Sequence, residues 1–338
     1  MYSFRNDYSE GAHPKVLQAL ADTNLRQTVG YGMDPCCQAA ADTIRRLCAA
    51  PDAAVHFLVG GTQVNLVTID AFLQSYEAVV AAQTGHVSTH ETGAIEATGH
   101  KVCTVESPDG KLTPALVESV LAGHNGTEHM VLPRMVYISD TTEIGTVYTR
   151  AELAALRQCC DVHGLFLYLD GARLGSALTS PDNDLTLPDL AALTHAFTIG
   201  GTKTAPSSGG AGAHPSHASL PLAHEAAGRR AGQGPAAGTP VPGPAGGRAL
   251  LRPGPPRQRA GLPARDGVAA LDIPSGGLPS NQQFPVLPNE TVAKLQEMGY
   301  EFETDHPVDA NHTCIRLVTS WATPETAVED FLRDLAGC

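Results

Sequence analysis

The chain has 338 residues, of which 42% are hydrophobic, and a formal net charge of −13. This length predicts two domains or one large α/β unit, and the hydrophobic content excludes global disorder. The acidic balance argues against a nucleic-acid-binding surface, and no apolar run is long enough for a transmembrane helix. The charged first residues, MYSFRNDYSEG, give no sign of a signal peptide. Eight cysteines with no C-x-x-C fit neither a disulfide framework nor a zinc site. We therefore expect a cytoplasmic protein that binds neither nucleic acid nor membranes.

Strand and helix patterns alternate along the chain up to residue 203. The predicted strands cover residues 55–59, 78–83, 101–106, 135–139, 165–169 and 195–199, and the predicted helices cover 62–76, 113–121 and 150–162. Apolar strands separated by helices indicate a mostly parallel sheet that is covered on both faces. Ligands of such sheets lie beyond the carboxyl ends of the strands, so the polar residues that follow each strand are the candidates for a site.

The composition changes abruptly after Lys203. Residues 204–265 contain seven Arg and one Glu, and Ala, Gly and Pro dominate the stretch. Such a composition buries too little apolar surface to offset the entropy of ordering, which predicts a disordered linker. A second hypothesis is that this stretch is translated out of frame. Codons for its first five residues, TAPSS, can become codons for NGALL by insertion of one nucleotide.

Ordinary composition resumes near Asp266. The patterns predict strands at 282–287 and 314–318 and helices at 291–297 and 324–335. These elements indicate a small α+β domain over residues 266–338, after a large domain over residues 1–265.

Three features that follow predicted strands suggest a chemistry. The glycines of Gly60-Gly61-Thr62-Gln63 and the free N–H groups of the next helix suit a single phosphate, although such a turn can also be a plain tight connection. Asp170 ends a buried strand, where it can pair with a buried positive group or cap the next helix. Lys203 follows another buried strand, where desolvation lowers the pKa of an amine and lets it form a Schiff base. A lone lysine is more commonly a surface group.

A fourth feature is the segment from His86 to His100, which holds three His and two Glu. Its spacing is not HExxH, so we expect no metal site there, and the His86 ring can instead stack on a flat cofactor. A phosphate cup, an acid for a pyridine nitrogen, a Schiff-base lysine and a stacking ring are together what pyridoxal phosphate (PLP) requires.

Seven segments also carry a family resemblance. They are FRNDYSEGAHP, VGYGMDP, FLVGGTQVN, HVSTHETGAIEATGHKV, LYLDGARLG, FTIGGTK and CIRLVTSWAT, and they cover roughly residues 1–203 and 266–338. The most specific part is DGAR followed by a post-strand lysine. On these motifs the chain resembles the threonine aldolase / aromatic amino acid β-eliminating lyase family. The resemblance implies the α/β fold of fold-type-I PLP enzymes, with a mostly parallel sheet and a small C-terminal domain.

The resemblance also implies roles for individual residues. Lys203 would be the Schiff-base lysine, Asp170 would pair with the pyridine nitrogen, and His86 would stack on the cofactor ring. Gly61 and Thr62 would hold the phosphate. His86 and a water molecule are both candidates for the base that removes the substrate's β-hydroxyl proton.

On the substrate side, Arg173 and Arg316 would bind the substrate carboxylate, a task that suits a bidentate guanidinium. The alternative for Arg316 is a surface charge at a strand edge. Asn6, Asp7 and Tyr31 fall in family segments that approach the substrate.

The reaction implied is the PLP-dependent retro-aldol cleavage of L-threonine or L-allo-threonine to glycine and acetaldehyde by a homodimer or homotetramer. The alternatives are another fold-type-I reaction, such as β-elimination or racemisation, and a catalytically silent chain. The last follows if residues 204–265 replace a helix and a strand of the large domain.

Overall fold

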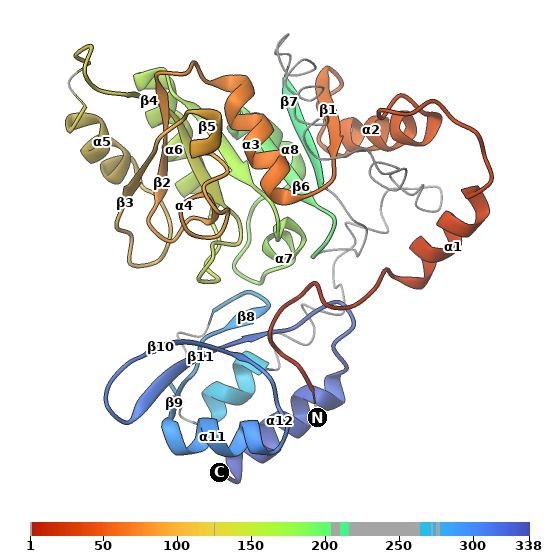
Figure 1. Cartoon of the computed structure of the whole chain (residues 1–338), viewed down its shortest axis with the longest axis vertical. Coiled ribbons are helices and arrows are strands. Elements are labelled where there is room, and N and C mark those ends of the chain that lie inside the picture. The colour runs from red at the N-terminus through yellow and green to blue at the C-terminus, as the bar shows by residue number, and fades with distance from the viewer. Residues whose placement is uncertain (1, 125, 204–209, 216–263, 272, 275–277) are drawn as a thin grey trace.

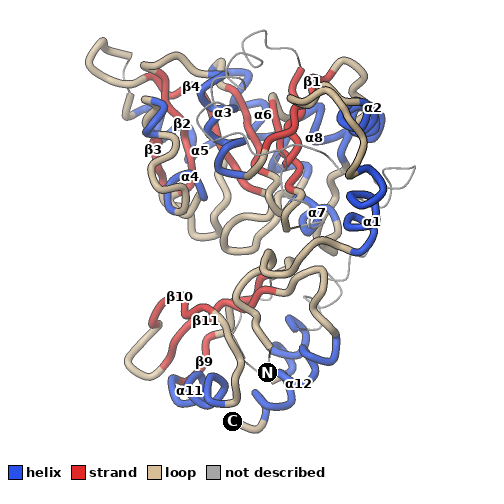
Figure 2. The backbone as a smooth tube through the Cα atoms, turned by 45° about the vertical axis from the view of Figure 1, so that its right-hand side comes forward, coloured by secondary structure: helices blue, strands red, loops and turns tan. Residues whose placement is uncertain are grey.

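The computed structural model describes residues 2–124, 126–203, 210–215, 264–271, 273–274 and 278–338. Two units are visible in Figures 1 and 2, with the large sheet in one and both chain termini in the other. The elements of the larger unit are α1 (Pro14–Thr23), α2 (Pro35–Leu47), β1 (Ala53–Leu58), α3 (Gly61–Phe72), β2 (Glu77–Ala82), α4 (His86–Thr89), the 3₁₀ turn η1 (Glu96–Thr98), β3 (Val102–Val105), α5 (Pro114–Ala122), β4 (Leu132–Ser139), α6 (Arg150–His163), β5 (Phe166–Asp170), α7 (Leu174–Leu178), α8 (Leu187–Leu193), β6 (Ala196–Gly200) and β7 (Gly210–Pro215).

The large sheet has the strand order β1-β7-β6-β5-β4-β2-β3. Strands β6, β5, β4, β2 and β3 are parallel to one another, whereas β7 runs antiparallel to both β1 and β6. Every residue of β2 is buried, as expected for a parallel strand that is covered on both faces. The parallel strands therefore end at one edge of the sheet, where Asp170 and the turn to Lys203 lie.

Two separate apolar clusters stabilise the two faces of this sheet. One contains Leu153, Leu156 and Leu167, and the other contains Ile69, Met135 and Tyr168. The helices begin where polar side chains cap them. Thr149 and Glu152 form a capping box at α6, and Asp34 accepts N–H bonds at the start of α2.

The smaller unit contains β8 (Gln282–Gln283), β9 (Val286–Pro288), α11 (Asn289–Glu297), β10 (Glu303–Pro307), β11 (His312–Val318) and α12 (Glu325–Ala336). Strand β11 is central and pairs antiparallel with β8, β9 and β10. The N-terminal segment joins this unit, because the Phe4 N–H donates to Glu301 O and the Val318 N–H donates to Phe4 O. Phe4 packs in its core with Tyr300 and Phe331. The predicted division at residue 265 remains a prediction.

The predicted parallel sheet and its strands through residue 200 are confirmed, with ends shifted by a few residues. The single strand predicted at 282–287 is wrong, because the chain forms two short strands on either side of Phe284 and Pro285. Residues Gly210–Pro215 form β7 and pair with β1 and β6, so the predicted disordered linker is wrong there. Most of the other residues of 204–265 lie outside the described residues, so the frame hypothesis stays a prediction. Among the described helices, none is long and apolar enough to cross a membrane.

Candidate active site

Asp170 is the centre of a buried polar network at the end of β5. Its Oδ2 accepts hydrogen bonds from Tyr137 Oη at 2.7 Å and Asn65 Nδ2 at 2.8 Å, and its Oδ1 accepts from the Ala172 N–H at 2.9 Å. Burial, followed by the charge of Asp170, raises the pKa of Tyr137 well above its ordinary value, so the phenol remains a proton donor. The site thus holds a carboxylate in a fixed orientation.

The network extends from Asp170 to His86 through Asn65 and Glu91. Asn65 also donates to Glu91 Oε1 at 2.7 Å and accepts from Tyr168 Oη at 2.6 Å. The same Glu91 oxygen lies 2.7 Å from His86 Nδ1. This contact orients the His86 ring through Nδ1. Glu91 Oε2 is buried and has no hydrogen-bond partner.

The backbone of His86 is fixed by a second carboxyl group. Glu143 Oε1 accepts from the His86 N–H at 2.9 Å and from Ser139 Oγ at 2.6 Å. Burial raises the pKa of Glu143. The His86 ring is held through both its backbone and Nδ1, while 34% of its side chain stays exposed.

Two glycines bring the ends of β5 and β6 together. The Gly200 N–H donates to Gly171 O at 2.9 Å, and the Gly171 N–H donates to Thr198 Oγ1 at 2.8 Å. A Cβ on Gly171 would overlap the carbonyl oxygen of Thr198, and one on Gly200 would overlap that of Ala172. The close approach therefore requires glycine at both positions, and it sets the turn to Lys203 beside Asp170.

Lys203, His86 and Arg316 all lie close enough to His90 to affect its pKa. Desolvation lowers the pKa of His90, and the charges of His86, Arg316 and Lys203 lower it further. The His90 and His86 ring centroids are 5.7 Å apart, and Lys203 Nζ lies 5.9 Å from the Tyr8 ring. His90 is thus a neutral imidazole that lies near the positive charges of Lys203 and Arg316.

Arg316 and the start of α3 offer unused donors at this site. Arg316 Nε is buried without a hydrogen-bond partner, and its Nη2 lies 3.4 Å from Arg5 O. Gly61 and Thr62 form the first turn of α3 and are exposed, and open space surrounds the Cα of Gly61. Backbone N–H groups in this position attract an anion.

Arg173 and Asp7 are paired with each other. Arg173 Nε and Nη2 lie 2.9 and 3.2 Å from the two oxygens of Asp7, whose side chain is fully buried. Asn281 Nδ2 also donates to Asp7, at 3.0 Å. Two of the Arg173 nitrogens, Nε and Nη2, are therefore engaged by the protein itself.

Asn6 and Tyr31 lie in other surroundings. Asn6 Oδ1 accepts from the Tyr8 N–H and from Ser9 Oγ, which is a local turn. Tyr31 has a positive φ of 64° and is 78% exposed. No recorded contact joins Tyr31 to the other candidates in the described part of the chain, so its role remains a prediction.

The sequence did not predict the contacts of Asn65, Tyr137 and Glu143, which hold Asp170 and His86 in place. Glu91 and His90 were noted only as members of the segment from His86 to His100, without a role in this network. Asn65 and Glu91 fall within the motifs GGTQVN and HETG, which was the only available signal. Tyr137 and Glu143 belong to a strand and a loop with no distinguishing pattern.

This donor set fits PLP. A buried carboxylate with three donors suits a protonated ring nitrogen, the first turn of α3 suits a phosphate, and the unpartnered Arg316 Nε suits a substrate carboxylate. Lys203 supplies an amine on the turn that follows β6, near His90.

Three comparisons with known proteins agree with this geometry. Residues 4–239 match the family model described as beta-eliminating lyase. A low specificity L-threonine aldolase from Pseudomonas sp. (strain NCIMB 10558) is 37% identical over 176 residues, which cover 52% of this chain and 50% of that protein. A protein of the same name from Saccharomyces cerevisiae is 28% identical over 51% of this chain and 44% of its own length. The chain thus spans about half the length of the curated relatives it matches.

Solved structures align over nearly the whole chain. A threonine aldolase from Leishmania major is 44% identical with a TM-score of 0.92, covering 99% of this chain and 98% of that one. An aspartate aminotransferase from Thermus thermophilus has a TM-score of 0.72 at 17% identity, covering 99% and 91% of the two chains, and it shows a likeness of fold alone. The predicted fold-type-I architecture is confirmed.

Proposed function

The chain belongs to the beta-eliminating lyase family, and from that premise we propose that it is a PLP-dependent aldehyde-lyase. Its substrate would be a small β-hydroxy amino acid, L-threonine or L-allo-threonine, and its products glycine and acetaldehyde. The proposal depends above all on the junction of β5 and β6, where the Gly200 N–H donates a hydrogen bond to Gly171 O. At that junction the end of β5, with the buried Asp170 that accepts three hydrogen bonds, meets the end of β6, which is followed by the turn that bears Lys203.

Each residue of the proposed site has a definite task. Lys203 Nζ would hold the cofactor, Asp170 would keep a proton on its ring nitrogen, and Gly61 and Thr62 would bind its phosphate. Bound PLP supplies an electron sink for the Cα–Cβ bond that breaks. Since Asp170 is fixed by Tyr137 and Asn65, it is oriented before any ligand arrives.

His86 would serve as both the stacking ring and the proton acceptor. Glu91 holds its Nδ1, and Nε2 would take the β-hydroxyl proton. His90, with its lowered pKa, is neutral at physiological pH and is a second acceptor beside it.

The carboxylate of the substrate would bind Arg316 through the buried Nε that has no partner in the protein. Arg173 would contribute as well, while Asp7 holds its Nε and Nη2. We also infer a cytoplasmic homodimer or homotetramer, as the family resemblance implies.

The test uses the full chain loaded with PLP. Incubation with L-threonine should give glycine and acetaldehyde in equal amounts, and borohydride reduction followed by peptide mapping should locate the cofactor on Lys203. Lys203→Ala should abolish both results, whereas Lys101→Ala, a change at an exposed lysine, should leave them intact.

Two outcomes would contradict the proposal. Release of ammonia and a keto acid in place of glycine and acetaldehyde would indicate β-elimination. Failure of the folded chain to bind PLP would indicate a catalytically silent protein, and sequencing of the gene around codons 204–265 would then test the frame hypothesis.

A further inference from the structure

Three side chains with metal-binding donors meet on the surface between α5 and α6. Glu118 lies on α5, and Cys159 and His163 lie four residues apart on α6, which places them on one face of that helix. A carboxylate oxygen, the thiol sulfur and a ring nitrogen all lie within 4.8 Å of one another. These residues belong to different elements from those of the proposed active site.

The backbone that carries this cluster is firmly packed. Val117 and Leu156, which neighbour the cluster in sequence, are fully buried in the same apolar core. Helix α5 packs against α6 as well as against β3. The three donors are therefore held close together by the fold, and small rotations of the side chains suffice to make them converge.

We propose that Glu118, Cys159 and His163 form a surface site for Zn²⁺. Sulfur, imidazole nitrogen and carboxylate oxygen are the ligands that zinc prefers. Glu118 Oε1 and His163 Nε2 are 3.6 Å apart, close to the roughly 3.3–3.6 Å between two ligand atoms on a tetrahedral zinc.

The exposure of the three residues indicates the form of the site. Cys159 is 7% exposed, whereas the side chains of Glu118 and His163 are 58% and 37% exposed. The buried sulfur would thus bind the ion on its protein-facing side, and a water molecule on the solvent-facing side would be the fourth ligand. One zinc ion enters, the Cys159 thiol loses one proton to solvent, and a Zn–S bond forms.

Burial and the Glu118 carboxylate raise the pKa of the Cys159 thiol. Bound zinc would link α5 to α6 and stabilise the folded chain, and this inference is independent of the proposed lyase function.

A second group of donors in the smaller unit provides a matched comparison. Asp305, His306 and Cys314 also lie within 4.8 Å of one another. Here, however, His306 Nδ1 is held by the adjacent Asp305 at 2.8 Å, on a strand whose residues are all exposed. Cys314 Sγ is directed to Phe284 O at 3.7 Å. The Asp305–His306 contact is much shorter than the 3.6 Å between Glu118 and His163, and Cys314 Sγ faces a backbone oxygen, so we assign no site to these donors.

The experiment is a titration of the PLP-loaded full chain with Co²⁺, which replaces Zn²⁺ and reports its ligands by visible absorption. We expect one equivalent of cobalt to bind with the long-wavelength bands of a tetrahedral site and a thiolate-to-cobalt band, all of which zinc abolishes. Cys159→Ser should remove the thiolate band. His163→Ala and Glu118→Gln, both at exposed positions, should weaken binding by at least about tenfold, and Cys314→Ser should change nothing.

Thermal unfolding gives a second measurement that does not depend on colour. Zinc should raise the Tm of the unaltered chain and of Cys314→Ser, but not that of His163→Ala. An unchanged thiolate band in Cys159→Ser, loss of the band only in Cys314→Ser, or no cobalt binding to the unaltered chain would each overturn the proposal.

Discussion

Asp140 and Asp170 lie at the ends of the neighbouring parallel strands β4 and β5, and both side chains are buried. A hydrogen bond joins their backbones, because the Asp140 N–H donates to Asp170 O at 3.0 Å. Asp170 accepts three hydrogen bonds of 2.7–2.9 Å. Asp140 has a single long contact, 3.4 Å from the Tyr148 N–H.

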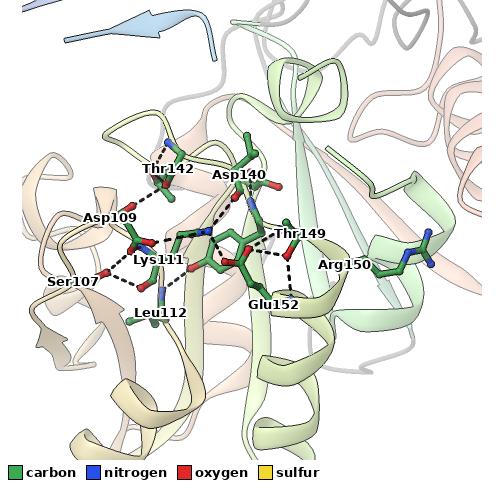
Figure 3. Close-up of polar contacts among 12 residues, drawn as sticks. Ser107, Asp109, Lys111, Leu112, Asp140, Thr142, Thr149, Arg150 and Glu152 are labelled. Carbon is green, nitrogen blue, oxygen red and sulfur yellow. Dashed lines mark hydrogen bonds and ion pairs between the residues drawn. The ribbon is translucent and has the colours of Figure 1, made fainter. Parts of the chain in front are cut away.

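The surroundings of Asp140 favour its neutral form. Burial raises the pKa of Asp140 to about 8, while the Tyr148 N–H and Lys111 lower it and Glu152 raises it. Figure 3 shows Asp140 near Lys111 and Glu152, where the lysine pairs with Glu152 at 2.5 Å. Burial of an acidic side chain therefore does not by itself indicate a functional site. The hydrogen bonds distinguish the two acids, because Asp170 accepts three short bonds and Asp140 accepts a single long one.

The largest effect is expected for Asp170→Asn. If Asp170 pairs with a protonated ring nitrogen, the neutral amide leaves that charge buried without its partner, which costs about 3–5 kcal/mol. The affinity for PLP should therefore fall roughly 100-fold or more. A titration of the cofactor-free chain with PLP, followed by absorbance, measures this loss.

Asp140→Asn is the matched control for that experiment, because it makes the same chemical change one strand away. It should leave the affinity for PLP unchanged. Equal losses in the two variants would show that the donors around Asp170 have no special role.

The second effect concerns stability, and here Asp140→Asn should be stabilising. An unfolded chain releases the Asp140 proton near pH 4, whereas the folded chain keeps it up to about pH 8. The folded state binds more protons in this window, so stability falls as the pH rises, by about 1.4 kcal/mol per pH unit from this group. Asparagine does not titrate, so Asp140→Asn lacks this pH-dependent loss. Its free energy of unfolding should therefore exceed that of the unaltered chain by an amount that grows by about 1.4 kcal/mol per pH unit.

Urea unfolding of both chains at about pH 5, 6 and 7 measures the difference, which amounts to about 4 kcal/mol at pH 7. A difference that is constant with pH, or that shrinks as the pH rises, would mean that Asp140 is ionised in the folded chain.

The third effect comes from a substitution that would push the ends of β5 and β6 apart. Gly200→Ala places a methyl group against the Ala172 carbonyl, and such overpacking costs about 1–3 kcal/mol or more. It should also reduce the yield of borohydride-trapped cofactor, because the turn to Lys203 moves away from Asp170. Gly123→Ala is the control, since a Cβ there meets only an ordinary contact at 3.4 Å. Normal trapping in Gly200→Ala would show that the junction does not position the lysine.

Asp140 and Asp170 also show how far the sequence can be interpreted. Both residues follow a run of apolar residues, MVYIS and LFLYL, and this local pattern cannot separate them. The strands themselves were predictable because buried parallel strands are continuously apolar. The identity of the site residue came from the DGAR motif, in which Gly171 permits the close approach to β6.

The partners of the site were not predictable in the same way. Asn65 is 105 residues from Asp170 along the chain, and Glu91 is 26 residues from Asn65. Such pairs form only when the sheet brings α3, α4 and β5 together. Likewise, the pairing of Arg173 with Asp7 spans 166 residues, and the sequence placed both on the substrate side without indicating that they bind each other.

The smallest effect is expected for Tyr137→Phe, which removes one of the three donors to Asp170. A single buried hydrogen bond contributes about 1 kcal/mol, so the affinity for PLP should fall roughly fivefold. Tyr148→Phe is the control, because this equally buried phenol accepts from the Leu112 N–H at 2.7 Å and its backbone N–H contacts Asp140. Both variants should lose stability, but only Tyr137→Phe should lose affinity. An equal loss of affinity in both would mean that the difference between the two acids lies in packing, whereas a loss confined to Tyr137→Phe assigns it to the donors.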